Sequence, residues 1–341
     1  MKVDILAGEP QFIDHLAPVH FALPEADRGD FIVWKSAHSR MTESDLIARA
    51  VRRGVLPATK MSAEDRPILV ASWGDYQKVR LHRTRIARME HGIGQSFLGS
   101  DHQSYAGGKD AEAVGLFIVP NAHSADRWQR AYPQASVAIV GSPKLDSLPP
   151  RIAGPGPVVA LSFHWSAGPS RGPLAETNGS FGEYRGTLPA LAKEFSVIGH
   201  GHPRALLNMS GIYRRASIPV IEDFEDVCRM ADVYVCDTNS TIYEFASTGR
   251  PVVVVNGSHF RRNVKHGLRF DWGVGTNVGV QCDSPKALID AIHEALEDAP
   301  AQQAKREAAL NTVYAYRTGA ANRASLALVQ WAAGLALVEA A

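Results

Sequence analysis

The chain has 341 residues, of which 45% are hydrophobic and 21% are charged, a globular composition that excludes collagen-like and wholly disordered chains. Lys and Arg number 36 and Asp and Glu 35, so the net charge of +1 creates no overall field that draws the chain to nucleic acid or an anionic membrane. The length is about twice that of a usual domain, which predicts two domains.

Short, β-branched apolar runs alternate with helical periodicity in the first half of the chain. Residues 44–53 are one predicted helix, with Thr42 as its cap and Asp45 three residues further on, as in a capping box. Continuous apolar strands with helices between them predict a parallel sheet that is covered on both faces. The predicted strands are residues 3–7, 31–34, 68–72, 85–90, 116–119 and 137–140.

Residues 145–157 are rich in proline and glycine, which suits a linker between domains. A second series of strands and helices follows, and the tail over residues 302–341 is predicted to be helical. We therefore predict an N-terminal domain over residues 1–150, a C-terminal domain over 151–315 and a terminal helix over 316–341. The second series has predicted strands at 158–163, 195–198, 218–221, 233–236, 252–255 and 278–281, and predicted helices at 224–230 and 241–247.

Three cysteines, Cys228, Cys236 and Cys282, form no CxxC pair, which favours a reducing compartment without a disulfide framework or a zinc site. The N-terminal sequence turns polar too early for a signal peptide, and no run of 18 apolar residues occurs. We therefore expect a cytoplasmic protein without an integral membrane segment.

Open parallel sheets bind ligands at the carboxyl ends of their strands, so two facing domains of this kind predict a ligand cleft between them. No GxGxxG follows the first strand and no GxxxxGK[ST] occurs, which disfavours a dinucleotide site and a P-loop. Chemistry is therefore expected in the other loops that follow strands.

The segment DTNSTIYEFASTGRP begins at Asp237. A predicted strand ends there and a helix begins near Ser240, so the amides and hydroxyls of Ser240 and Thr241 are expected at a positive helix end that suits a phosphate. Glu244 follows one turn later, where a carboxylate is placed to accept hydrogen bonds from a ribose diol. The alternative is that Ser240 only caps the helix and that Glu244 is a surface acid.

The stretch ADVYVCDTNSTIYEFASTGRPVVVV resembles the nucleotide-phosphate-binding segment of the CDP-glycerol glycerophosphotransferases. MEHGIGQSF, VIGHGHPR, IVPNAHSADRWQRAYPQASVAIVGSPKLDSL and RTGAANR resemble further segments of the family. The resemblance implies the GT-B fold, with two Rossmann-like doubly wound domains facing a central cleft and a C-terminal helix that crosses back to the first domain. It also implies that Asp237 and Glu244 bind the nucleotide.

The resemblance places the proposed catalytic base at His91. An imidazole there is suited to take the proton of an acceptor hydroxyl, because its ordinary pKa lies near the working pH. Glu90 stands where the family has Trp, which implies a different acceptor. His15 is a second candidate on the acceptor side and Asp75 is the next candidate base, whereas the alternative for His91 is a histidine that only shapes the turn.

On the donor side, the resemblance implies that His202 faces the donor phosphates, with His200 as its substitute. Arg262 follows the predicted strand 252–255 and is expected near the same phosphates, and Arg171 is a further candidate. The alternatives are a loop histidine and solvated surface arginines.

These residues predict a nucleotide-dependent GT-B transferase that moves a sugar or a polyol phosphate from a CDP-glycerol-like donor or a nucleotide sugar to a hydroxyl acceptor. No DxD triplet and no clustered Cys/His ligands occur, so we expect no metal and no cofactor. A hydrolysing UDP-sugar 2-epimerase and a non-catalytic nucleotide-binding protein are the alternatives. The expected partners are the donor and the acceptor, without nucleic acid, and assembly as a homodimer stays open.

Overall fold

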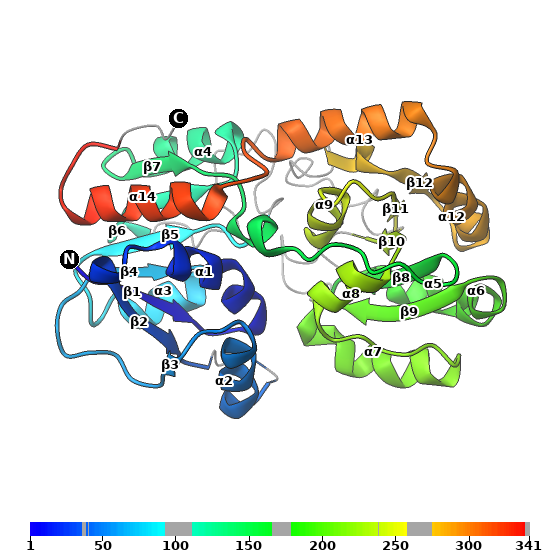
Figure 1. Cartoon of the computed structure of the whole chain (residues 1–341), viewed down its shortest axis with the longest axis horizontal. Helices are drawn as coiled ribbons and strands as arrows, with labels where there is room; N and C mark the ends of the chain where they lie inside the picture. Colours follow the sequence, from blue (N-terminus) through cyan, green and yellow to red (C-terminus); the bar gives the residue numbers. More distant parts are fainter. Residues whose placement is uncertain are drawn as a thin grey trace. The chain divides into compact units, whose positions relative to one another are not determined.

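The computed structural model describes residues 1–35, 39, 41–92, 111–165, 179–237, 239–257 and 275–337. They form two compact units (Figure 1). The first unit contains the chain up to Ser147 and again from Tyr314 onward, and most of the second runs from Leu148 to Val313. Each unit is built on one parallel β-sheet with helices on both faces.

The first sheet has seven parallel strands in the order β3-β2-β1-β4-β5-β6-β7. This is the doubly wound order, in which the chain moves outward from β1 in one direction and then from β4 in the other. Its strands are β1 (Val3–Ala7), β2 (Arg28–Val33), β3 (Pro57–Ala58), β4 (Ile68–Val70), β5 (Ile86–Met89), β6 (Val114–Val119) and β7 (Ser136–Ile139).

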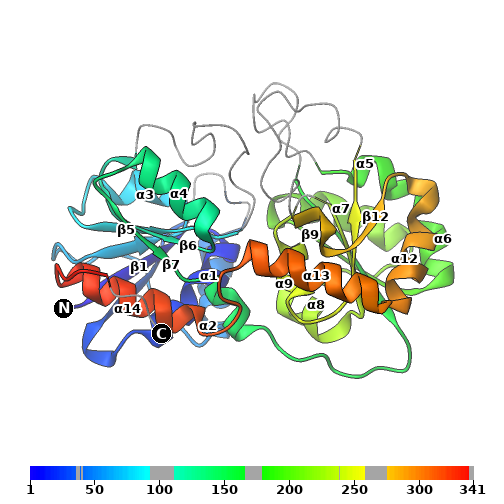
Figure 2. The same cartoon turned by 90° about the horizontal axis from the view of Figure 1, so that it is seen from above.

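Two apolar clusters cover the two faces of this sheet, and the helices that contribute to them lie on its two sides in Figure 2. On one face α1 (Pro10–Ala22), α2 (Glu43–Arg52) and α14 (Ala320–Ala332) pack against side chains such as Val3 and Ile5. On the other face α3 (Trp73–Val79) and α4 (Ala122–Ala131) pack against Leu6 and Val70. Strand residues alternate between the two clusters, as the period of two in a strand requires.

Three helices of the first unit, α2, α3 and α4, begin after residues whose side chains cap them. Thr42 and Asp45 form the expected capping box at α2, with Thr42 Oγ1 accepting from the Asp45 amide and Asp45 Oδ2 accepting from the Thr42 amide. Ser72 accepts from the third amide of α3 in the same way. At α1, Pro10 is the first helical residue, where its missing N–H costs nothing.

The C-terminal helix α14 packs on the first unit. Its Ala324, Leu328 and Ala332 belong to the apolar cluster beneath α1. Ser325 Oγ donates to the Ala22 carbonyl over 3.0 Å, and the Ala321 amide donates to Asp146 Oδ2 over 2.7 Å. The predicted crossing of the terminal helix back to the first unit is therefore observed.

The second sheet has five parallel strands in the order β12-β11-β10-β8-β9. Its strands are β8 (Val158–Phe163), β9 (Ser196–Gly201), β10 (Val233–Cys236), β11 (Val252–Val255) and β12 (Val280–Cys282). One face packs against α5 (Phe181–Tyr184), α6 (Leu188–Glu194), α7 (Pro203–Arg215) and α12 (Leu288–Glu297). The other α-helices among the described residues of this unit are α8 (Phe224–Met230), α9 (Thr241–Ala246) and α13 (Pro300–Val313).

The predicted fold class, two parallel α/β sheets of the GT-B type, is confirmed, whereas two local predictions are wrong and one strand was missed. Residues 218–221 form only an isolated bridge between Gly199 and Val220, because Pro219 has no N–H to donate and Ser217 adopts a left-handed φ of 58°. Strand β3 was not predicted, since Pro57–Ala58 is too short to show alternation. The single helical tail is two helices, α13 and α14, separated by residues 314–319.

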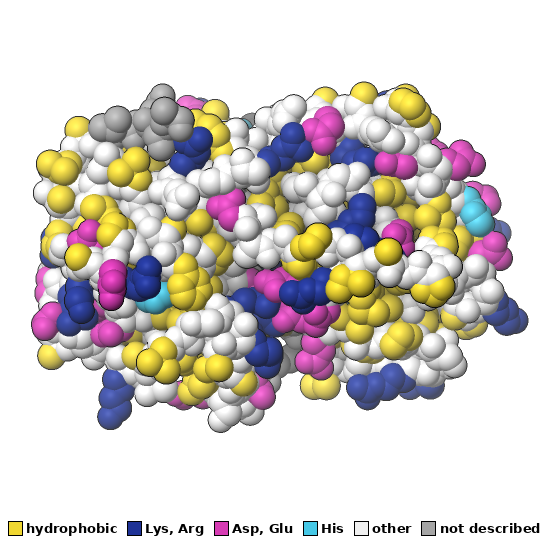
Figure 3. All heavy atoms as spheres, in the orientation of Figure 1, with side chains coloured by type: hydrophobic (Ala, Val, Ile, Leu, Met, Phe, Trp, Pro, Cys, Tyr) yellow, Lys and Arg dark blue, Asp and Glu magenta, His cyan; other side chains and the backbone are white. Residues whose placement is uncertain are grey.

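On the face drawn in Figure 3, basic and acidic side chains are interspersed rather than gathered into one large patch of a single sign, in keeping with the net charge of +1. None of the helices in the described part of the chain combines the length and apolar character that crossing a bilayer requires.

Candidate functional site

Each sheet has one point at which the strand order reverses, and such switch points are where open α/β sheets bind ligands. In the first sheet this point lies between β1 and β4, and in the second between β8 and β10. The carboxyl ends of these strands lead into Gly8 and Ser72 in the first unit, and into His164 and Asp237 in the second. We describe the two groups of residues separately.

Asp75 bridges the switch point of the first sheet. It lies in the first turn of α3, is fully buried, and accepts a hydrogen bond at Oδ2 from the Gly8 amide over 3.2 Å. A Cβ at residue 8 would lie 2.2 Å from Asp75 Oδ1, so only glycine permits this approach. The loop after β1 and the helix after β4 are thereby joined through one carboxyl group.

Burial raises the pKa of Asp75 to about 7. The positive charge of Lys78 partly opposes this increase, and the negative charge of Glu9 adds to it. The Lys78 ammonium is 3.9 Å from Oδ1, too far for a close ion pair. Oδ1 is buried without a hydrogen-bond partner among the described residues. A carboxyl group that titrates near neutrality at a switch point is suited to exchange a proton with a ligand.

His91 lies two residues beyond β5, and its Nδ1 hydrogen bonds to the Ala71 carbonyl. Nδ1 must therefore carry a proton, so in the neutral ring the lone pair is on Nε2, the form that a general base needs. The ring packs edge-on against Phe12 with centroids 4.5 Å apart, and the His15 ring is 6.5 Å away. The structure thus brings together both predicted acceptor-side histidines.

His15 does not lie in a loop, because Pro10 already begins α1 and His15 is buried in it with 2% exposure. Glu90, next to His91, accepts a hydrogen bond at Oε1 from the Trp128 indole over 2.8 Å. Burial raises the pKa of Glu90, against the opposing effects of hydrogen bonding and of Arg88. The first unit therefore offers two acids with raised pKa values, the buried Asp75 in the helix after β4 and the partly buried Glu90 directly after β5.

In the second unit, Asp237 holds two backbone segments together. Its Oδ1 accepts from the His164 amide over 2.8 Å and its Oδ2 from the Ser180 amide over 2.7 Å, and Asp237 is only 4% exposed. Gly179 passes so close that a Cβ there would meet the His164 carbonyl at 2.0 Å. Both carboxylate oxygens are thus engaged by protein amides, which indicates a bracing role for the residue that the resemblance assigns to nucleotide binding.

The start of α9 differs in detail from the expectation. Asn239 Oδ1 accepts from the Thr241 amide over 3.3 Å, whereas Ser240 forms no capping hydrogen bond with its side chain. The Thr241 hydroxyl is 2.7 Å from the buried Tyr234 hydroxyl and hydrogen bonds to it. The Thr241 hydroxyl is therefore turned toward the core, although both predicted phosphate ligands, Ser240 and Thr241, are partly exposed.

Glu244 is 1% exposed, so the alternative that it is a surface acid is wrong. It lies in the first turn of α9, and the Tyr234 and Phe245 rings stack beside it with centroids 5.0 Å apart. Because burial removes the hydration of a carboxylate, the Glu244 carboxylate must have hydrogen-bond or charged partners that replace it.

His202 begins α7 and lies in a cluster of aromatic and basic side chains at the carboxyl ends of β8 and β9. Its Nδ1 accepts from the Arg204 amide over 3.2 Å, so Nε2 carries the proton and is a donor. Its ring is 5.0 Å from that of His164, and the Arg204 guanidinium is 5.5 Å from the centre of the Trp165 ring. His200 instead is 5% exposed and hydrogen bonds to the Ile221 carbonyl.

Sequence reasoning did not single out Trp165, Arg204 or Asn239. Their common signal is that each lies two or three residues beyond the end of a strand of the second sheet. Arg262 and Arg171 lie outside the described residues. In the described part of the chain, no three Cys, His, Asp or Glu side chains are grouped in a way that would hold a metal ion.

The two sheets and their switch points define a two-unit α/β protein of the GT-B-like class. Solved structures of similar fold include UDP-GlcNAc 2-epimerase from Neisseria meningitidis bound to UDP-GlcNAc, with a TM-score of 0.64, 13% identity, and 97% of this chain and 99% of that chain covered. S. aureus MnaA in a co-structure with UDP has a TM-score of 0.64 and 12% identity, with 100% and 99% covered. The wall teichoic acid polymerase TagF has a TM-score of 0.56 and 11% identity, with 98% and 89% covered.

Residues 188–329 match the model of the CDP-Glycerol:Poly(glycerophosphate) glycerophosphotransferase family. The matched stretch includes His202 and the whole segment from Asp237 to Glu244. The resemblance predicted from the sequence is therefore confirmed over this stretch. A search of the curated proteins found no match.

Proposed function

We propose that this protein transfers a polyol phosphate from a CDP-glycerol-like donor to a hydroxyl acceptor. The observation that carries the proposal is the family match over residues 188–329, because it covers His202 and the segment from Asp237 to Glu244, which follow β9 and β10. Transfer of a sugar from a nucleotide sugar is the alternative within the same type of reaction.

The second unit supplies the donor half of the reaction. His202 Nε2 donates to a phosphate oxygen of the donor, and the Arg204 guanidinium beside Trp165 adds a positive charge there. Ser240 binds a second phosphate oxygen, and Glu244 accepts from the ribose hydroxyls. Asp237 keeps the ends of the loop between His164 and Ser180 in place.

The first unit supplies the acceptor half. As the acceptor oxygen bonds to the phosphorus of the glycerol phosphate, the P–O bond to the nucleotide breaks and CMP leaves. His91 Nε2 takes the proton of the acceptor hydroxyl, while the Ala71 carbonyl stabilises the resulting imidazolium through Nδ1–H. The charge that gathers on CMP is stabilised by the donor-site groups named above.

The test is release of CMP from CDP-glycerol by the full-length protein, measured with and without a panel of polyol, sugar and glycan acceptors. We expect acceptor-dependent CMP release that persists in EDTA. His202→Ala should lower it at least about 100-fold, as expected for loss of one leaving-group donor. The matched control is His293→Ala, an exposed histidine on α12 paired with Glu194, which should leave the rate unchanged.

A complete and Mg²⁺-reversible loss of activity in EDTA contradicts the metal-independent donor site. Binding of CDP-glycerol without transfer to any acceptor instead supports the non-catalytic nucleotide-binding alternative.

One observation favours the second candidate, a UDP-sugar 2-epimerase. That reaction needs acidic groups near the sugar and no acceptor, and the first unit contains the buried Asp75 and the partly buried Glu90, both with raised pKa values. Incubation with UDP-GlcNAc alone discriminates the two functions. Release of UDP together with an epimerised sugar, abolished in Asp75→Asn, supports the epimerase and contradicts the transferase.

A further inference from the structure

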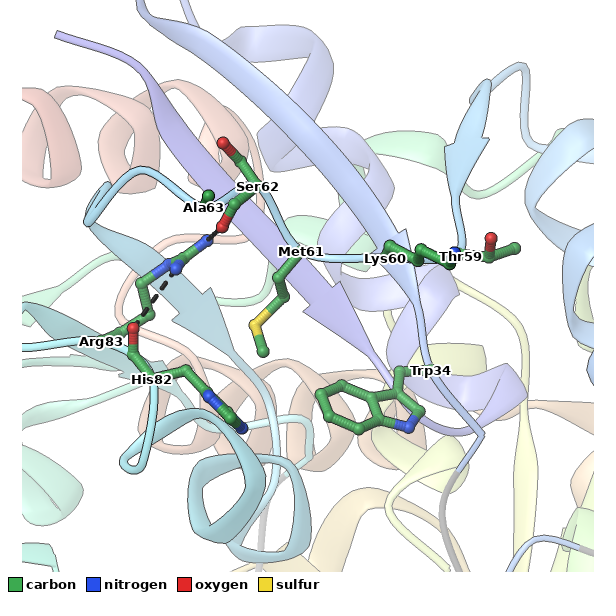
Figure 4. A pocket seen from close by; sticks show the side chains of 8 residues that line it. All are labelled: Trp34, Thr59, Lys60, Met61, Ser62, Ala63, His82 and Arg83. Carbon is green, nitrogen blue, oxygen red and sulfur yellow. Dashed lines mark hydrogen bonds between the residues drawn. The ribbon is translucent and has the colours of Figure 1, made fainter.

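A cavity of about 400 Å³ opens in the first unit, at the lateral edge of the sheet where β3 and β2 lie. The segment that connects β3 to β4 contains no helix, so this part of the sheet has less cover than the rest. The volume falls in the range of small-molecule sites. The cavity is lined by Trp34, Thr59, Lys60, Met61, Ser62, Ala63, His82 and Arg83 (Figure 4).

Three side chains form an apolar and aromatic surface in this pocket. Trp34, Met61 and His82 point toward a common space in Figure 4. The Trp34 and His82 ring centroids are 6.4 Å apart with the rings inclined at 39°, and Trp34 is 38% exposed. The Lys78 ammonium lies 5.3 Å from the Trp34 ring centre and donates to the Trp34 carbonyl over 2.8 Å. The indole is therefore held in place with part of its surface available.

The charge of the lining is positive, because it contains Lys60 and Arg83 and no carboxylate, and His82 adds a ring N–H donor. Arg83 is engaged within the protein, since it donates to the Ser62 carbonyl over 2.9 Å and pairs with Asp4 at 3.4 Å. Lys60 and His82 are exposed and have no ion-pair partner among the described residues. An anionic group would therefore be attracted to these two side chains.

The ring geometry restricts the rest of the ligand. A flat base between two rings needs about 7 Å and nearly parallel rings, since each stacking contact takes about 3.5 Å. The observed 6.4 Å and 39° do not meet this requirement. On the indole alone, a puckered sugar ring can place its apolar C–H face, and the lining then supplies the Thr59 and Ser62 hydroxyls for sugar hydroxyls but no side-chain amide or carboxylate to bind the edge of a base. We propose that the pocket binds an anionic saccharide, with its ring on Trp34 and its anionic group at Lys60 and His82.

The pocket is separate from the residues around His91. Trp34 directly follows β2 and His91 follows β5, which are three strand spacings apart, or about 14 Å. A saccharide bound here is therefore not the reacting group of the proposed transfer. In the proposed transfer, this saccharide would be a remote unit of a longer acceptor, a role that rests on the proposed function. Binding of the saccharide to the pocket does not rest on it.

The experiment is calorimetric titration of the full-length protein with glucose 6-phosphate, glucose, inorganic phosphate and AMP. We expect glucose 6-phosphate to bind at least about tenfold more tightly than any of the other three. Trp34→Ala should weaken this binding about tenfold and Lys60→Ala about fivefold. The matched control is Trp73→Ala, because Trp73 is 40% exposed in the same unit and does not line the pocket.

Unchanged affinity for glucose 6-phosphate in a folded Trp34→Ala protein overturns the proposal, as does equal weakening by Trp73→Ala. Tighter binding of AMP or equal binding of inorganic phosphate also overturns it, because neither needs a sugar ring on the indole. The exposed Lys60 keeps the test decisive if Trp34→Ala does not fold. CDP-glycerol affinity, measured on the same variants, should stay unchanged whether or not transfer is ever observed.

Discussion

Asp75→Asn should stabilise the protein at alkaline pH. The carboxyl pKa is 3.8 in the unfolded chain and about 7 in the folded one, so folding raises it. A group of this kind contributes stability below pH 3.8 that is lost as the pH rises through about 7. The difference in pKa, at about 1.36 kcal/mol per pH unit, amounts to a cost of about 4 kcal/mol above pH 8. An amide of nearly the same shape carries no such cost.

The pH dependence gives a sharper test than the absolute stability. Between pH 5 and pH 8, titration of Asp75 should lower the free energy of unfolding by roughly 2.5 kcal/mol in the wild type. In Asp75→Asn this contribution should vanish, although the Gly8 amide then faces an amide group that can still accept at its oxygen. Urea unfolding at both pH values, followed by tryptophan fluorescence, measures the difference between the two proteins.

Asp126→Asn is the matched control, because Asp126 has a side chain that is 61% exposed on α4 of the same unit. It should retain the wild-type pH dependence. An Asp75→Asn protein with the same change in unfolding free energy as the wild type between pH 5 and pH 8 would refute the buried, proton-binding state of Asp75. A gain in stability together with a loss of turnover would indicate that the acid is retained for function at a cost in stability.

Three further predictions concern Asp237, His20 and His91. Asp237→Ala should lower the unfolding free energy by roughly 2 to 4 kcal/mol, since two hydrogen bonds to a carboxylate are lost, and a variant with an unchanged melting temperature would contradict the bracing role. Burial and, to a lesser extent, the charge of Arg28 lower the pKa of His20 to about 4. The free energy of unfolding should therefore fall by up to roughly 3 kcal/mol as the pH decreases from 6.5 to 4. His20→Phe should remove this sensitivity to acid, which acid unfolding curves measure. His91→Gln should lower turnover by about 10² to 10⁴ without changing donor affinity, and retention of a third of the turnover would exclude His91 as the base.

Local features of the fold could be predicted from the sequence because their causes lie within a few residues. The Thr42–Asp45 capping box is set by two residues three positions apart, and α8 and β10 have the predicted bounds. The alternation of apolar runs and helices was enough to predict two parallel sheets. The likeness of the Asp237 segment to one family could also be recognised from the sequence, since that segment is continuous along the chain.

The tertiary structure decided which residues meet. Gly8 and Asp75 are 67 residues apart in the chain, and they meet because the strand order places β4 beside β1. Asp237 accepts from amides 73 and 57 residues away, and no local sequence pattern links those residues to it. The Trp34 pocket likewise depends on strand order and on a connection that forms no helix. Periodicity and capping report on neighbours along the chain, whereas the environment of a side chain, and with it the pKa of Asp75, depends on neighbours in space.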